Sequence, residues 1–312
     1  MLLAMKIKVV MACAALASPI ALTVAPAHLN HRTEYSNFVE IVPARFQYRM
    51  AGDFSRDGKP AEAPLHDTQL PGSLKIMTRQ VTAGEYAACV DDGACPRIAF
   101  ASGVADRPAV GLSWRDATAY ADWMTRRTGI IHRLPTDDEW VFAAAEKASV
   151  EALPLVDPVD PSRAWIARYE AEANRARPIA FDPQPVGSFG RNGRGLQDVA
   201  GNVWEWTNTC FLRMTLEPSG IARVTNTNCG VRVVQGAHRT YMTDFIRDPR
   251  TGGCAAGVPP ANLGFRLVVE DRKPPALNRI VERAIGKIGG HLFSRSLDVF
   301  EFDRARAEGS KP

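Results

Sequence analysis

The sequence lacks the excess of positive charge that nucleic-acid-binding proteins gather on one face. Its 38 Lys and Arg residues nearly balance its 34 Asp and Glu residues, which leaves a formal net charge of +4 on 312 residues. We therefore expect no nucleic-acid partner. The chain also has no internal repeat and no low-complexity tract, and its 46% hydrophobic and 23% charged content is that of an ordinary globular protein.

The apolar run from Val9 to Val24 is short for a membrane span. Lys6 and Lys8 precede it, and Ala25-Pro26-Ala27 supplies small residues at the expected cleavage positions. We therefore predict a signal peptide over residues 1–27 and export to a periplasmic or extracellular location. A retained N-terminal anchor is the alternative.

Cysteine is scarce, and export would leave five: Cys89, Cys95, Cys210, Cys229 and Cys254. Cys89 and Cys95 flank a turn-forming sequence and can close a small disulfide loop. Cys210 and Cys229 flank another loop-like stretch and could pair, although sequence alone does not fix the pairing. Cys254 is then left over as a reactive, intermolecular or buried thiol.

Three helices are expected where a Ser or Thr is followed three residues later by an acid, the pattern of a capping box. The pairs are Thr82 with Glu85, Ser113 with Asp116, and Thr136 with Glu139. The inward-facing side chains expected on these helices are Tyr86, Val90, Ala117, Tyr120, Ala121, Met124, Trp140, Ala143 and Ala144.

Regular patterning fades after Lys147, and short strands are expected at residues 222–224, 232–235 and 264–269. We predict an extended lead-in over residues 28–45 and one loop-rich α+β domain over residues 46–270. The tail over residues 271–312 contains an amphipathic helical pattern. That helix could pack on its own domain, dock on a partner or lie on a membrane surface.

The segment from Gly195 to Trp206 places two carboxylates and two indoles within twelve residues. Asp198 and Glu205 supply the carboxylates, in a pattern that favours a buried loop organised around a bound cation. The alternative is that Asp198 is a turn residue and that Glu205 is hydrogen-bonded to the backbone.

Four segments occur in an order that resembles the formylglycine-generating enzyme, or sulfatase-modifying factor, superfamily. They are residues 79–86 (RQVTAGEY), 133–140 (RLPTDDEW), 195–206 (GLQDVAGNVWEW) and 262–266 (NLGFR). The resemblance implies a variant of the C-type-lectin-like fold with long ordered loops. Members of the superfamily carry out different chemistries, including copper-dependent and iron-dependent oxidations, so the fold does not give the function.

The resemblance also implies a structural calcium ion in the segment from Gly195 to Trp206. Carried over by position, Asp198 and Glu205 would supply side-chain oxygens, and Gly201 and Val203 would supply carbonyl oxygens. A glycine at position 201 would let the chain turn tightly enough for both carbonyls to point at the ion.

The oxidases of this superfamily bind copper(I) through two cysteines five residues apart, and this chain has Ala237 and Met242 at the matching positions. Formylglycine chemistry by that mechanism is therefore in doubt, because thiolates are the ligands that suit copper(I). The remaining catalytic candidates are His238, Arg239 and Cys254. An iron site is also doubtful, because neither His66 nor His132 lies in a recognisable ligand motif.

Trp204 and Arg266 also match superfamily positions and are candidates for a substrate groove. The expected function is that of an exported maturation or accessory factor for a client protein or peptide. The alternatives are an oxidoreductase with altered metal ligation and a non-catalytic, lectin-like binding module.

Overall fold

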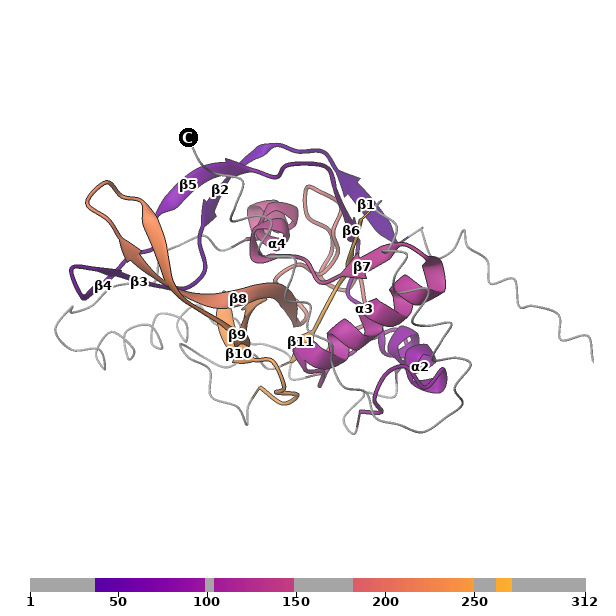
Figure 1. Cartoon of the computed structure of the whole chain (residues 1–312). Helices are drawn as coiled ribbons and strands as arrows, with labels where there is room; N and C mark the ends of the chain where they lie inside the picture. The colour runs from indigo at the N-terminus through magenta and orange to yellow at the C-terminus, as the bar shows by residue number, and fades with distance from the viewer. Residues whose placement is uncertain (1–36, 99–103, 149–181, 250–261, 271–312) are drawn as a thin grey trace, which may run out of the picture. The chain divides into compact units, whose positions relative to one another are not determined.

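The computed structural model describes residues 37–98, 104–148, 182–249 and 262–270. The predicted signal peptide, the C-terminal tail and Cys254 lie outside these described residues. Within the described ranges, no helix is long and apolar enough to cross a membrane. Helices and largely antiparallel strands alternate in irregular order, which confirms the predicted α+β class (Figure 1).

One four-stranded antiparallel sheet joins distant parts of the chain. Its strands, in spatial order, are β1 (Phe38–Ile41), β6 (Leu74–Met77), β12 (Val268–Glu270) and β7 (Ile131–Arg133). β1 falls within the predicted lead-in, yet it pairs with β6 along its whole length. The ordered body therefore includes residues upstream of Phe46.

A second sheet is built on a long hairpin. Its strands are β10 (Thr240–Thr243), β9 (Ala222–Gln235), β8 (Trp204–Leu216), β3 (Asp53–Arg56) and β4 (Lys59–Ala61), and β11 (Leu263–Gly264) also pairs with β8. β3 and β11 both run parallel to β8, whereas β9 is antiparallel to it. The two short strands predicted at residues 222–224 and 232–235 are thus the two ends of β9, and the one predicted at 264–269 divides into β11 and β12.

Two further strands, β2 (Arg45–Arg49) and β5 (Leu65–Gln69), form a separate antiparallel ribbon. The ribbon contacts α4 (Asp137–Ala144), where Phe46 of β2 packs on Phe142 with ring centroids 5.0 Å apart. A short 3₁₀ turn, η1 (Ala145–Lys147), continues α4.

All three predicted helices are present. α2 (Ala83–Asp91) begins at Thr82, α3 (Trp114–Thr128) at Ser113 and α4 at Thr136, and each start is a complete capping box. Gly129 ends α3 with φ 72°, the left-handed conformation that glycine adopts without cost. The predicted inward-facing side chains are buried or pack against the core, which confirms the helical periodicity.

Each capping-box acid is also held by an arginine. The pairs are Arg79 with Glu85, Arg133 with Glu139, and Arg247 with Asp116. Burial alone would raise the pKa of these carboxyls, but the arginines and the capping donors outweigh burial and lower each pKa. The starts of the helices are therefore fixed by charge as well as by hydrogen bonds.

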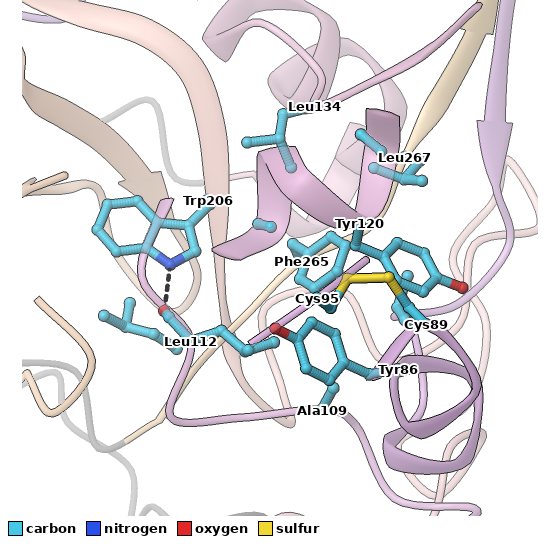
Figure 2. Close-up of a cluster of buried hydrophobic side chains, with 14 of the residues drawn as sticks. Tyr86, Cys89, Cys95, Ala109, Leu112, Tyr120, Leu134, Trp206, Phe265 and Leu267 are labelled. Carbon is cyan, nitrogen blue, oxygen red and sulfur yellow. Dashed lines mark hydrogen bonds between the residues drawn. A yellow bond between two sulfur atoms is a disulfide. The ribbon is translucent and has the colours of Figure 1, made fainter. Parts of the chain in front are cut away.

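The main core lies between α2, α3 and β8 (Figure 2). Tyr86 stacks on Tyr120, and Phe265 meets Tyr120 edge-on at 5.4 Å between ring centroids. Trp206, which is fully buried, donates from Nε1 to the Leu112 carbonyl at 2.8 Å. This bond satisfies the one polar atom of the indole, so Trp206 serves as an anchor of the core.

Candidate functional site

Glu205 on β8 is a fully buried carboxylate with four hydrogen-bond donors. Oε1 accepts from Gln80 Nε2 and from Arg266 Nη2, both at 2.7 Å. Oε2 accepts from Trp140 Nε1 at 2.8 Å and from Arg266 Nε at 2.6 Å. Arg266 is itself fully buried, and its other donors reach the carbonyls of Met77, Thr78 and Gln197. Arg266 therefore compensates Glu205, and its burial does not fit the predicted role in a substrate groove.

Asp198 is bonded to the backbone. Its Oδ1 accepts from the Phe189 amide at 2.8 Å, and its Oδ2 accepts from the Gly187 amide. The residue has φ 57°, a left-handed conformation that Asp tolerates better than most side chains. Gly201, by contrast, is not among the positive-φ glycines, and a Cβ there would lie 3.0 Å from the Phe189 ring. The chain thus turns through left-handed residues at Asp198 and Ala200, and Gly201 instead leaves room for the Phe189 ring.

The contacts of Glu205 do not fit its predicted role as a calcium ligand. A carboxylate offers about four acceptor positions, and protein donors occupy all of those on Glu205. The Arg266 guanidinium would also repel a cation at this point. Gln80 Oε1 is buried and has no partner in the described part of the chain, but calcium takes six to eight oxygens. Calcium binding, with Asp198, Gly201 and Val203 as the other proposed ligands, stays a prediction.

Trp204, a candidate for the substrate groove, and His238, a candidate catalytic residue, lie side by side. Their rings meet edge-on with centroids 5.5 Å apart. Trp204 is almost entirely buried against Gly236, where an added Cβ would lie only 2.5 Å from the indole Cδ1. His238 is partly exposed. Only a glycine at position 236 allows Trp204 to lie against this turn, so the backbone at Gly236 positions the indole beside His238.

Arg239 belongs to a buried polar cluster beside that face. Its Nη2 lies 2.9 Å from Asp137 Oδ2, an oxygen that also accepts from Tyr48 Oη at 2.6 Å. Gln235 Nε2 donates to the other oxygen of the same carboxylate. Burial alone would lower the pKa of Arg239, but Asp137 outweighs burial and raises it. Arg239 is therefore a permanent cation that Asp137 holds in place.

Arg239 and Trp204 both keep a buried donor without a partner. Within the described ranges, Arg239 Nε and Trp204 Nε1 make no hydrogen bond. Buried N–H groups are nearly always paired, because an unpaired one costs about 1–3 kcal/mol. Both donors are inaccessible to solvent in the described structure, so each is a cost to stability that the packing around Trp204 and Asp137 offsets.

Ala237 and Met242 stand where the oxidases have copper-binding cysteines, and the two residues differ in burial. Ala237 is exposed, whereas Met242 on β10 is fully buried in the main core. Val234, which pairs with Thr240 beside them, is buried too. Met242 therefore contributes its thioether to packing, and the three positions together offer no thiolate and no hydroxyl.

Several residues of the site were not anticipated from the sequence. No role is predicted from the sequence for Asp137, Gln80 or Tyr48. Gln80 lies within the segment 79–86 that carries the resemblance, which was a usable signal. Tyr48 and Asp137 are 89 residues apart, and no local pattern joins them.

Both predicted disulfides are present. Cys89 pairs with Cys95 at the end of α2, and Cys210 pairs with Cys229. The second disulfide crosses the β8–β9 hairpin rather than a loop, because residues 210–229 are mostly strand. The expected pairing was therefore right, and the expected local structure around Cys210 and Cys229 was wrong.

Comparison with known proteins identifies the family. The sequence model of the sulfatase-modifying factor enzyme 1-like domain matches residues 26–271. A formylglycine-generating enzyme of Streptomyces coelicolor is 30% identical over 179 residues, which is 53% of this chain and 53% of that protein. An inactive C-alpha-formylglycine-generating enzyme 2 of Mus musculus is 32% identical over 173 residues, which is 54% of this chain and 50% of that protein.

The chain thus spans about half the length of the curated relatives it matches. Among solved structures, PvdO from Pseudomonas aeruginosa is similar, with 23% sequence identity, a TM-score of 0.46 and coverage of 75% of this chain and 94% of that one. The family match covers the four segments that carry the resemblance and extends upstream of Phe46. The chain belongs to the sulfatase-modifying factor enzyme 1-like domain family.

Proposed function

We propose that this protein is an exported maturation or accessory factor that binds another exported protein or peptide. The observation that carries the proposal is the lack of cysteine at the two positions where the oxidases bind copper(I). The scaffold that surrounds them is intact, yet Ala237 and Met242 stand where the oxidases have thiols, and Met242 is packed in the core. Copper(I) chemistry on a thiolate pair has no ligands at these two positions.

Binding is assigned to the face formed by Trp204, His238 and Arg239. His238 is the partly exposed member of this face, and its ring nitrogens can donate to or accept from the main chain of a peptide. Asp137 holds the Arg239 charge in place, so little conformational entropy is lost on binding. The name of the inactive relative in Mus musculus agrees with a family in which not every member is an oxidase.

Export is supported by the basic and apolar residues near the N-terminus and by the two disulfides. Disulfides form and persist in oxidising compartments such as the periplasm or the exterior of the cell. A client in the same compartment would meet the folded protein there.

A copper(I) titration of the purified protein tests the absence of oxidase chemistry. The matched control is A237C/M242C, which restores the thiol pair. We expect tight copper(I) binding by the control and none by the wild type. Tight binding by the wild type that is lost in Cys254→Ser would contradict the proposal and favour an oxidoreductase with other ligands.

Recognition of a client is tested by capture from the exported fraction. We expect the wild type to retain one or a few proteins that His238→Ala does not retain, because His238 is the partly exposed member of the face. Equal retention by the two variants would remove His238 from the binding face. Retention of nothing beyond an unrelated control protein would refute an accessory role.

A further inference from the structure

The disulfides of the described chain lie in different surroundings. Cys89 and Cys95 are almost entirely buried, at 0% and 7% exposure, and belong to the main core. Cys210 and Cys229, by contrast, are both partly exposed. A disulfide exchanges only when a thiolate can reach one of its sulfurs, so access favours exchange at Cys210 and Cys229.

Cys229 lies at an irregular point of the β8–β9 hairpin. Cys210 stands opposite Arg232, and the next pair along the hairpin is Phe211 with Asn228. The pairing therefore leaves out Cys229 and the two residues after it, as in a bulge. Both neighbours of Cys229 along the chain are exposed. The Cys229 side of the disulfide is thus the side that an incoming thiol can approach.

A guanidinium lies against the other sulfur of this disulfide. Arg232 Nη1 is 3.1 Å from Cys210 Sγ and donates to the Asn208 carbonyl oxygen at 2.8 Å. The guanidinium also lies over the Trp114 ring, 3.9 Å from its centroid. Arg232 has further contacts in the protein, but a guanidinium keeps its positive charge beside any partner. A fixed positive charge is therefore held against Cys210 before any reaction.

The position of this charge determines which sulfur departs when the disulfide is cleaved. A neighbouring cation stabilises a thiolate, and a disulfide is cleaved faster when the departing sulfur is a stable thiolate. Cys210 is the sulfur beside Arg232, whereas Cys229 is the one with exposed neighbours. We propose that the Cys210–Cys229 disulfide is a thiol-exchange site, which a dithiol reductant attacks at Cys229.

The exchange has two steps. In the first, a thiolate of the reductant forms a bond to Cys229 Sγ, the bond between Cys229 and Cys210 breaks, and its electron pair leaves on Cys210 Sγ beside Arg232. In the second, the other thiol of the reductant attacks its own sulfur in the mixed disulfide and releases Cys229. Two electrons and two protons pass in total from the dithiol to the protein, and the reductant becomes a disulfide.

This reaction goes beyond the proposed function and does not depend on a client. Cys210 belongs to β8, which begins at Trp204, and Cys229 belongs to β9, which leads toward His238. Reduction removes the covalent link between the two strands at a point where their pairing is irregular. The oxidised and reduced proteins therefore differ in how firmly this hairpin is held together.

The first test identifies the sulfur that is attacked. The full-length wild-type protein is exposed briefly to excess reduced glutathione, quenched with acid, alkylated and mapped by mass spectrometry. Glutathione has a single thiol, so the adduct marks the sulfur to which it was transferred. We expect glutathione on Cys229 and the alkyl group on Cys210. An adduct mainly on Cys210, or an equal mixture of the two adducts, would overturn the proposal.

The second test measures the rate of reduction of each disulfide by dithiothreitol. In the wild type we expect Cys210–Cys229 to be reduced about tenfold faster than Cys89–Cys95, or more, because its sulfurs are accessible. Arg232→Met should slow reduction of Cys210–Cys229 about tenfold and weaken the preference for Cys229. Arg213→Met, which removes an exposed arginine of the same strand as Cys210, is the matched control and should change the rate less than about twofold.

Equal reduction rates in the wild type and in Arg232→Met would overturn the proposal, as would equal rates for the two disulfides of the wild type. The buried Cys89–Cys95 pair also reports whether the variant is folded. If that pair becomes rapidly reducible in Arg232→Met, the variant has unfolded, and the position of the glutathione adduct in the wild type then decides.

Discussion

Replacing Arg266 with Met would test whether the Glu205 carboxylate is compensated by protein alone. The substitution keeps the apolar volume of the side chain and removes two bonds to Glu205. Gln80 and Trp140 would remain as donors, but neither carries a charge. Breaking a fully buried pair by removing one partner costs about 3–5 kcal/mol, because the remaining charge stays out of water.

That loss corresponds to a fall in melting temperature of about 6–20 °C, since a domain of this size loses about 2–4 °C per kcal/mol. Thermal unfolding followed by circular dichroism measures it. The double variant Glu205→Gln/Arg266→Met should be less destabilised than the two single costs together, because it removes both charges. Arg223→Met, whose pair with Glu217 is exposed and 3.9 Å long, should change stability by less than about 1 kcal/mol.

Thermal unfolding in excess EGTA or in calcium chloride distinguishes two roles of Glu205. In one role its charge is neutralised by Arg266, and in the other it binds calcium. The resemblance to the family predicts that EGTA lowers the melting temperature, whereas the contacts of Glu205 predict no change in the wild type. A loss of less than about 1 kcal/mol in Arg266→Met would refute the compensation argument. A fall in wild-type melting temperature with EGTA, reversed by calcium and accompanied by bound calcium in elemental analysis, would restore the ion to this loop.

Three further outcomes follow from the structure. Gly236→Ala should displace Trp204 and lower the free energy of unfolding, measured in urea, by about 1–3 kcal/mol, because the added methyl overlaps a buried indole; an unchanged midpoint and an unchanged tryptophan emission spectrum would contradict this. Replacing Cys210 and Cys229 with Ser should lower the free energy of unfolding by about 3 kcal/mol, because the unfolded chain gains the entropy of an open loop. A loss below about 1 kcal/mol in urea denaturation would contradict this. Glu85 and Glu139 of the capping boxes have lowered pKa values, so the stability they contribute is present at neutral pH and is lost as pH falls below about 4. A melting temperature that does not decrease between about pH 5 and pH 3 would show that these two glutamates contribute little to stability.

The helices could be predicted because their signals are local. Thr82, Ser113 and Thr136 each lie three residues from the acid that completes the capping box, so both partners are visible in one short window. The long hairpin was missed because much of β9 is exposed and polar, without the alternation that a strand with one buried face shows. Its order depends on pairing with β8, which no window of β9 contains.

In the candidate site, too, some residues could be predicted from one short segment, and others are brought together only by the fold. Trp204 and Glu205 were recognised from their own segment, but their partners were not. Asp137 meets Gln235 across 98 residues, and Glu205 meets Arg266 across 61. Because a buried carboxylate can be a metal ligand or the partner of an arginine, the residue type alone does not decide between the two roles. The identity of its neighbours decides, and the fold supplies them.

The pairing of β8 also sets when the domain can fold during synthesis. β8 receives β3 from well upstream, with Asp53 opposite Arg213, and β11 from downstream, with Leu263 opposite Trp204. Until residue 266 has emerged, Glu205 lacks its cation, and the N-terminal end of β8 pairs with β9 on one side alone. A chain that stops before Arg266 would bury the Glu205 carboxylate without its counter-ion, so only a chain that reaches this residue gains the full stability of the core around β8.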